Sequence, residues 1–128
     1  MDSPVFQTEL KILGLLRAPD PIRDDILRSF GDDEEAATLF AIRWSWDHRR
    51  SKDMSQRVSA EYMGIPASHF SNILNGQKYL PPQKINAFEW IVGNRAVSMT
   101  IERFRQIRER ELVAGLAKAV AENMVRAA

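Results

Sequence analysis

Apolar residues along this chain recur mostly every three or four positions, and the strict alternation typical of half-buried strands is missing. A spacing of three and four brings residues to one face of a helix, so the pattern predicts an all-α fold. Proline and glycine separate the periodic segments and set their ends. The pattern predicts helices at residues 5–16, 21–30, 33–48, 56–62, 66–75, 82–92 and 96–124.

Residues with capping chemistry stand at the predicted helix ends. Asp20 is suited to cap helix 21–30, and Gly31 is suited to end it. Asp32 or Asp33 is suited to cap the third helix, whose first turn is acidic and therefore matches the helix dipole. The apolar side of this third helix is predicted to contain Ala36, Leu39, Phe40 and Trp44.

In the stretch MSQRVSAEYMGIPASHFSNILNG, residues 54–76, two apolar patterns meet at a glycine. Ser55 is a good N-cap for the first helix, and Gly64 can adopt the left-handed conformation that lets a chain leave a helix abruptly. Pro66 suits the first turn of the next helix, because its missing N–H would have no partner there. The side of this second helix that is predicted to be buried contains Phe70, Ile73 and Leu74.

The opposite side of helix 66–75 carries short side chains with very little charge. A helix that only faces solvent would more often carry Glu, Lys and Arg, whereas short amides and hydroxyls allow close approach to a surface. Asn suits bidentate contact with adenine, and Ser or His reaches base edges as well. This composition favours a helix that enters a DNA major groove, and a plain helical hairpin of the core is the alternative. The side chains concerned are Ala67, Ser68, His69, Ser71, Asn72 and Asn75.

The net charge of +1 conceals an uneven distribution along the chain. Residues 1–40 contain four basic and nine acidic residues, whereas residues 41–110 contain twelve basic and six acidic residues. The stretch 54–76 therefore lies within the positive segment, where a polyanion would be attracted. A chance scatter of surface charge explains the same counts equally well.

The remaining composition argues against several classes of protein. The chain has no cysteine, which excludes a disulfide framework, a thiolate metal site and a cysteine nucleophile. Its two histidines, His48 and His69, are not spaced with acids as metal ligands would be. No glycine-rich phosphate loop or pair of catalytic carboxylates is evident, so we expect neither an enzyme nor a cofactor. Without a long apolar run or a basic leader, we expect a cytoplasmic protein with no membrane contact.

Residues 37–93 resemble the lambda-repressor/Cro-like helix-turn-helix family. Phage repressors of that family carry a Ser-Gln pair opening the second helix, a central Ala, a Met-Gly or Leu-Gly turn, and an Asn-Gly pair closing the third helix. Two positions depart from the family: Ser59 replaces a core aliphatic residue, and Ala67 replaces a long amide or Arg. The matching residues are Ser55-Gln56, Ala60, Met63-Gly64 and Asn75-Gly76, with Phe70 and Ile73 at the buried positions.

This resemblance implies roles for residues at the matching positions and around them. The side chains that would face base edges are Ala67, Ser68, His69 and Asn72, the first reduced to a methyl contact. Phosphates would be contacted around the helix ends and in the loops, where Lys and Arg release counterions from DNA. The phosphate-contacting residues would be Arg49, Arg50, Lys52, Gln56, Arg57, Asn75 and Lys78.

The segment AFEWIVGN, residues 87–94, followed by a long helix, is similar to the phage lysogeny activators of the lambda type. This similarity implies a final helix that builds a homodimer or a higher homo-oligomer. The oligomer contacts would be Ile101, Phe104, Ile107, Leu112, Leu116 and Val120. The expected parts are an N-terminal helical extension at 1–31, a helix-turn-helix DNA-binding domain at 32–94 and an oligomerising helix at 95–128.

Two functions from different classes agree with these patterns. The first is a sequence-specific regulator of transcription, of phage or prophage type and either repressor or activator, that inserts helix 66–75 in the major groove of double-stranded DNA. The second is a protein-interaction module on the same fold, such as an antitoxin, an anti-repressor or an inhibitor of a host factor. The acidic N-terminal region favours the second, and in a regulator it is a candidate contact for RNA polymerase or another regulator.

Overall fold

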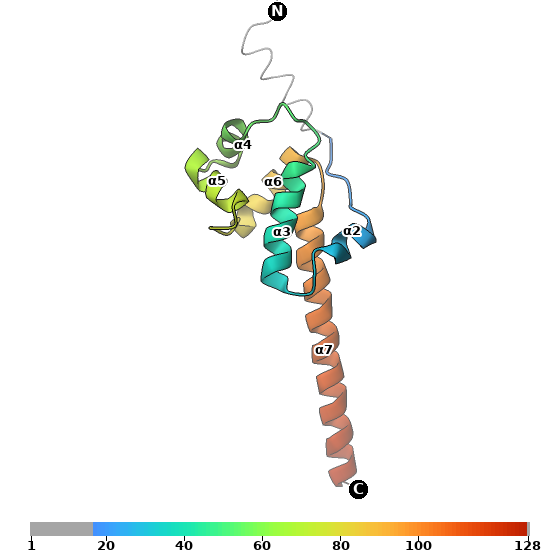
Figure 1. The fold of residues 1–128 in the computed structure, drawn as a ribbon. Helices are drawn as coiled ribbons and strands as arrows, with labels where there is room; N and C mark the ends of the chain where they lie inside the picture. Colours follow the sequence, from blue (N-terminus) through green and yellow to red (C-terminus); the bar gives the residue numbers. More distant parts are fainter. Residues whose placement is uncertain (1–16, 128) are drawn as a thin grey trace, which may run out of the picture.

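The computed structural model describes residues 17–127, and within this range it contains helices but no strand (Figure 1). The predicted all-α class is therefore confirmed, while the helix predicted at residues 5–16 lies outside the described residues. The elements are α2 (Asp24–Ser29), α3 (Glu34–Asp47), α4 (Gln56–Met63), α5 (Ala67–Leu74), the short 3-10 helix η1 (Pro82–Lys84), α6 (Ile85–Val92) and α7 (Ala96–Ala127).

Helix α2 begins three residues later than the sequence predicted, and Asp20 does not cap it. The N-cap is Arg23, which has extended backbone and no capping side-chain hydrogen bond. Asp20 instead pairs through its backbone: its N–H donates to the carbonyl of Gly93 at 3.0 Å, and its carbonyl accepts from the N–H of Arg95 at 2.9 Å. This pairing keeps the chain around Asp20 extended, so the helix starts only after it.

Helix α3 begins as predicted but buries a different face. The side chain of Asp33 accepts a hydrogen bond from the N–H of Ala36 at 3.0 Å, which confirms its role as N-cap. Ala36 is exposed and Phe40 is 56% exposed, whereas Leu39 and Trp44 are half-buried and Trp44 packs against the core, so the predicted apolar side was only partly right. The fully buried face is a neighbouring one, and α3 packs along α7. The buried residues of α3 are Ala37, Ala41, Ile42, Ser45 and Trp46.

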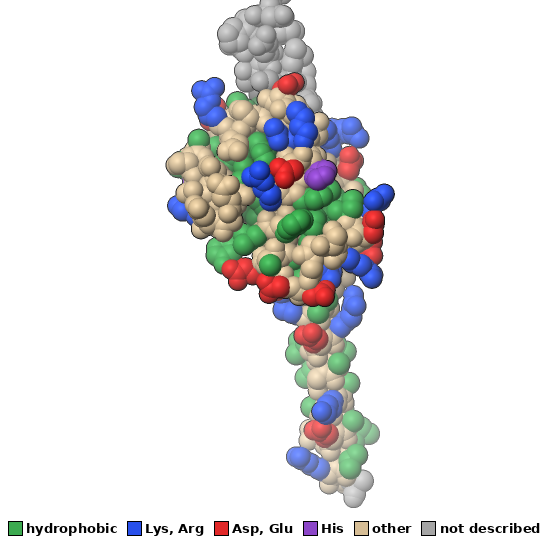
Figure 2. All heavy atoms as spheres, in the orientation of Figure 1, with side chains coloured by type: hydrophobic (Ala, Val, Ile, Leu, Met, Phe, Trp, Pro, Cys, Tyr) green, Lys and Arg blue, Asp and Glu red, His purple; other side chains and the backbone are tan. Residues whose placement is uncertain are grey.

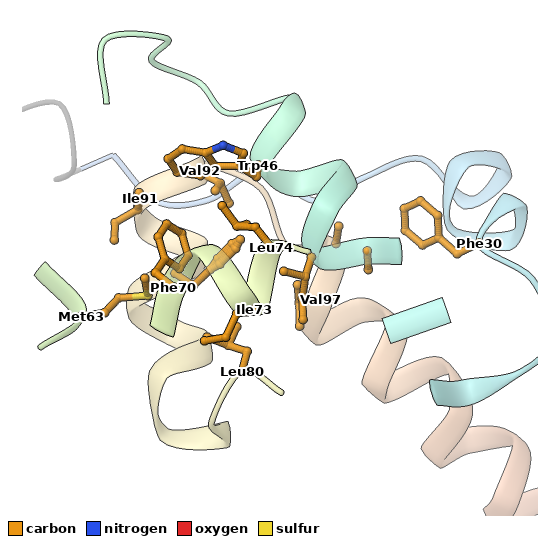
Figure 3. Close-up of a cluster of buried hydrophobic side chains, with 14 of the residues drawn as sticks. Phe30, Trp46, Met63, Phe70, Ile73, Leu74, Leu80, Ile91, Val92 and Val97 are labelled. Atoms are coloured by element: carbon orange, nitrogen blue, oxygen red, sulfur yellow. The ribbon is translucent and has the colours of Figure 1, made fainter. Parts of the chain in front are cut away.

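The core lies where α3, α4, α5, α6 and the first part of α7 meet (Figure 3). Phe70 of α5 stands at its centre, with its ring edge-on to Trp46 at 5.3 Å and to Phe88 at 6.2 Å between centroids. Such perpendicular aromatic contacts add to the stabilisation from burial alone. Each of the three rings comes from a different helix, so the contacts fix α5 against α3 and α6.

Helix α7 leaves the core after its first third and continues as a projecting rod (Figure 1). Phe104 is still buried and Ile107 is half-buried, whereas every residue from 108 to 127 is exposed. The helix extends three residues beyond the predicted end. No helix within residues 17–127, α7 included, is both long enough and apolar enough to cross a membrane.

Candidate nucleic-acid interface

Helices α4 and α5 are joined by a tight turn that the local sequence dictates. The side chain of Ser55 accepts a hydrogen bond from the N–H of Val58 at 3.2 Å and so caps α4 as predicted. Gly64 ends the helix with a φ of 69°, the left-handed conformation that glycine adopts without strain. Pro66 stands one position earlier than predicted, because it is the N-cap of α5 and not part of its first turn. The sequence 54–76 therefore forms the predicted helix, turn and helix.

The buried side of α5 fixes which side chains face outward. Phe70, Ile73 and Leu74 are all buried, as the sequence predicted. These three positions anchor α5 in the core from its middle to its C-terminal end. The remaining side chains of this eight-residue helix must then point away from the core.

The outward side of α5 presents polar groups that are free to bind a partner on a nearly uncharged surface. Ala67 and Ser68 are exposed, and His69 and Asn72 are half-buried. Within residues 17–127, none of these side chains makes a hydrogen bond or an ion pair, so their donors and acceptors remain available. Figure 2 shows the region of α5 at the left as a surface that is neither apolar nor charged, with Lys and Arg at its edges.

Four of the predicted phosphate-contacting residues have exposed side chains that bond to nothing else in the described part of the chain. These residues are Gln56, Arg57, Asn75 and Lys78. Lys52 is also exposed, although its ammonium group donates to the carbonyl oxygen of Asp47. Gln56 and Arg57 lie at the start of α4, and Lys52 lies in the loop before it. Asn75 is the C-cap of α5, and Lys78 lies in the loop that follows.

Lys84 lies beside the turn at Gly64 between α4 and α5, although no sequence pattern pointed to it as part of the candidate interface. Its Nζ lies 3.6 Å from the point where a Cβ on Gly64 would stand. Lys84 is half-buried and belongs to η1, twenty residues after the turn in sequence. Its only signal in the sequence was its charge, because the contact between η1 and the turn depends on the fold.

Arg49, one of the predicted phosphate contacts, is engaged within its own loop. Its guanidinium group donates to the carbonyl oxygens of Trp46 at 3.0 Å and of Met54 at 3.1 Å, and lies 4.2 Å from the centroid of the Trp46 ring. These contacts close the loop between α3 and α4 and use the charge internally. Arg49 therefore stabilises this loop, and its contact with phosphate stays a prediction.

Arg50 is likewise engaged within the chain. Its guanidinium group donates to the carbonyl oxygens of Arg17 at 3.0 Å, of Ala18 at 2.8 Å and of Gly93 at 3.1 Å, and lies 3.6 Å from a carboxylate oxygen of Asp20. It thereby ties the N-terminal segment to the junction of α6 and α7. The predicted phosphate contact of Arg50 would have to form alongside these internal bonds, and it stays a prediction.

Ser59 occupies a fully buried position in spite of its polar side chain. Its hydroxyl donates to the carbonyl oxygen of Ser55 at 2.8 Å, one turn earlier in α4. A buried hydroxyl that bonds to its own helix leaves no polar group without a partner. The departure from the family pattern at this position is thus compatible with a packed core.

The predicted oligomer contacts divide into two groups along α7. Phe104 is only 6% exposed and belongs to the core of its own chain, which corrects its assignment as an oligomer contact. Ile101 and Ile107 are half-buried against the same core. The three that remain on the projecting part are Leu112, Leu116 and Val120, each more than half exposed.

The described residues contain no group of three or more His, Asp or Glu side chains that could hold a metal ion. Comparison of the chain with family models, with curated proteins and with solved structures gave no match in any of the three. The function is therefore inferred from the polar surface of α5 and the exposed cations near it in the chain.

Proposed function

We propose that the protein is a sequence-specific DNA-binding regulator of transcription that inserts α5 in the major groove. The observation that carries this proposal is the outward side of α5, where Ser68, His69 and Asn72 present donors and acceptors that bond to nothing else within residues 17–127. A helix anchored along its other side by buried residues can enter a groove without rearrangement. Asn72 would read adenine, and Ser68 and His69 would reach neighbouring base edges.

The cations beside α5 support the same proposal. Arg57 lies at the start of α4, Lys78 follows α5, and Lys84 lies at the turn between them. Cations on both flanks of a reading helix would hold it in register by contacting phosphates on either side of the groove. This role needs no charge on α5 itself, which contains no Lys, Arg, Asp or Glu.

The second candidate function is a protein-interaction module on the same fold. The internal contacts of Arg49 and Arg50 favour it, because their guanidinium groups already bond to carbonyl oxygens of this chain. With fewer free cations, the sequence-independent part of DNA binding would be weak. In that case the polar side of α5 would contact another protein.

In the DNA-binding proposal, two copies of the protein act together through the projecting part of α7. Leu112, Leu116 and Val120 are exposed there, and a surface helix with a row of apolar residues gains stability when another helix covers it. A dimer would present two copies of α5 and bind two half-sites. This raises its specificity for a DNA sequence above that of a single short helix.

The experiment is selection of bound duplexes from a pool of random DNA by the purified full chain. Enrichment of a short common sequence is the expected result, and the variant Ser68→Ala/Asn72→Ala should lose that enrichment. The exposed face of α7 offers a matched control: Lys118→Ala should leave the enriched sequence unchanged, since it lies far from α5. Recovery of random sequences at every round, by the wild type as well, would overturn the proposal in favour of the interaction module.

A further inference from the structure

A groove of about 360 Å³ opens between α2, the C-terminal end of α3 and the junction of α6 and α7. Its apolar lining consists of Val92, which is buried, and of Ile22, Ile26 and Trp44, which are half-buried against the core. Half-buried apolar side chains beside an open groove leave apolar surface in contact with water. A chain segment with apolar side chains would remove this surface from water, which is favourable.

The apolar surface continues from the groove along the outside of α3. The imidazole of His48, which also lines the groove, stacks on the Trp44 ring at 4.2 Å between centroids. One turn before Trp44, the side chain of Phe40 is 56% exposed. The rings of Trp44 and Phe40 both contact the ring of Phe30, at 5.8 and 5.5 Å between centroids, so the groove and Phe40 form one surface. Figure 2 shows hydrophobic side chains gathered on this face beside a His side chain.

The N-terminal segment of the chain enters the described structure at this groove. Arg17, the first described residue, is part of the groove lining. The guanidinium group of Arg50 holds this entry in place by donating to the carbonyl oxygens of Arg17 at 3.0 Å and of Ala18 at 2.8 Å. A chain spans at most about 3.5 Å per residue, so the Cα of Leu13 must lie within about 14 Å of the Cα of Arg17. The residues just before Arg17 are therefore within reach of the groove.

The sequence of residues 5–16, which lie outside the described residues, is strongly apolar. Seven of these twelve residues have large apolar side chains, and only Glu9 and Lys11 are charged. A segment of this composition gains free energy when its side chains are removed from water. The seven are Val5, Phe6, Leu10, Ile12, Leu13, Leu15 and Leu16.

We propose that the groove and the adjoining surface of Phe40 bind residues 5–16 of the same chain. The position of Arg17 selects this occupant, because a segment joined directly to the groove has an effective concentration in the millimolar range. A second copy or an unrelated apolar peptide would compete with it at a far lower concentration. The bound segment would cover the half-buried side chains of Ile26 and Trp44 and the exposed ring of Phe40, and so hold α2 against α3.

This contact is independent of DNA binding. Among the described residues, the groove is lined by α2, α3, the segments that flank them and the junction of α6 and α7, and α5 contributes none of its side chains. The bound N-terminal segment would therefore leave the polar side of α5 open.

The first test measures how fast the thiol introduced by His48→Cys reacts with a maleimide dye in the full chain, which has no cysteine of its own. His48 is exposed within the described residues, so the N-terminal segment is what would slow a thiol there. Adding Leu13→Glu/Leu16→Glu should speed the reaction about tenfold, as for a segment that is bound about nine-tenths of the time before the change. Gln7→Glu/Thr8→Glu is the matched control, because it adds the same two charges at polar positions, and it should keep the slow rate. Equal rates in all three proteins, or equal acceleration by both pairs of changes, would overturn the proposal.

A second measurement identifies which chain supplies the segment. The variant Leu13→Cys/His48→Cys is treated with a short bis-maleimide, and we expect mainly a link within one chain, detected by the mass of the product. Leu13→Cys/Lys118→Cys is the control and should give no such link, because Lys118 lies about 33 Å along α7 from Ala96. Covalent dimers as the main product of the first variant would assign the groove to a second copy and overturn the proposal, and so would no link at all. Both measurements are made without DNA, so a failure of the proposed DNA binding would leave their outcomes unchanged.

Discussion

The guanidinium group of Arg50 lies directly over Gly93, at the junction of α6 and α7. A Cβ on Gly93 would stand 2.6 Å from Nε and 2.8 Å from Cβ of Arg50, closer than such atoms pack in proteins. Gly93 also has a φ of 83° and ends α6. The close approach lets Arg50 donate to the carbonyl oxygen of Gly93 and at the same time hold residues 17 and 18.

Gly93→Ala should therefore destabilise the protein strongly. The left-handed conformation costs an L residue about 1–2 kcal/mol, and the overlap with Arg50 should raise the total loss to about 3 kcal/mol or more. The control is Gly76→Ala, because Gly76 has a similar φ of 77° and nothing within 4 Å of its Cβ position. Denaturant unfolding followed by tryptophan fluorescence measures both. Equal losses for the two variants would show that the overlap contributes nothing.

Ser55→Ala should weaken the start of α4. The hydroxyl accepts from the N–H of Val58, and loss of such an N-cap costs about 1 kcal/mol. Ser51→Ala, at an exposed position in the preceding loop, should leave the free energy of unfolding within about 0.5 kcal/mol of the wild type. A loss at Ser51 as large as that at Ser55 would contradict this account of the cap.

Glu89 should make stability depend on pH. Burial raises the pKa of its carboxyl group above its ordinary value, and hydrogen bonds from the backbone and side chain of Ser98, together with the charge of Arg95, oppose this rise. Because the folded state then holds its proton more tightly than the unfolded state, the wild type should gain stability relative to Glu89→Gln as the pH falls from 7 towards 4.5. Unfolding of both proteins at a series of pH values measures the difference. A constant difference, or one of the opposite sign, would contradict the direction of this shift.

Much of the fold could be predicted because its signals are local. The cap at Ser55, the left-handed Gly64 and the apolar spacing of Phe70, Ile73 and Leu74 all act within a few residues, and each was found in its predicted place. The buried face of α3 was only partly predicted because the segment contains two overlapping apolar stripes. The packing of α3 on α7 helps to select between them, and α7 begins about fifty residues after α3 ends.

The contacts of the cationic side chains were harder to predict from the sequence than the positions of the helices. The sequence counts a charge but does not say which groups it contacts, and Arg50 bonds to backbone carbonyls that are 32 to 43 residues away. Lys84 shows the opposite error, since the fold brings it to the turn at Gly64 without any local pattern. The polar side of α5 was predictable because helix periodicity alone defines it.

Lys78→Ala should weaken binding to every DNA sequence alike. An exposed lysine that contacts phosphate contributes affinity without sequence information, so the slope of log affinity against log salt should become shallower by about one unit. Titration of a labelled duplex at several salt concentrations measures this slope. An unchanged slope would remove Lys78 from the interface, and loss confined to one sequence would assign it to base reading.

The affinity of the full chain for a selected duplex, compared with a shuffled duplex of the same composition, tests the central claim most directly. At physiological salt we expect the selected duplex to bind about 10³-fold tighter or more. Asn72→Ala and Ser68→Ala should each reduce only the specific affinity, by about 1–3 kcal/mol. Equal binding of the two duplexes by the wild type, or equal losses on both in the variants, would contradict the claim that α5 reads DNA.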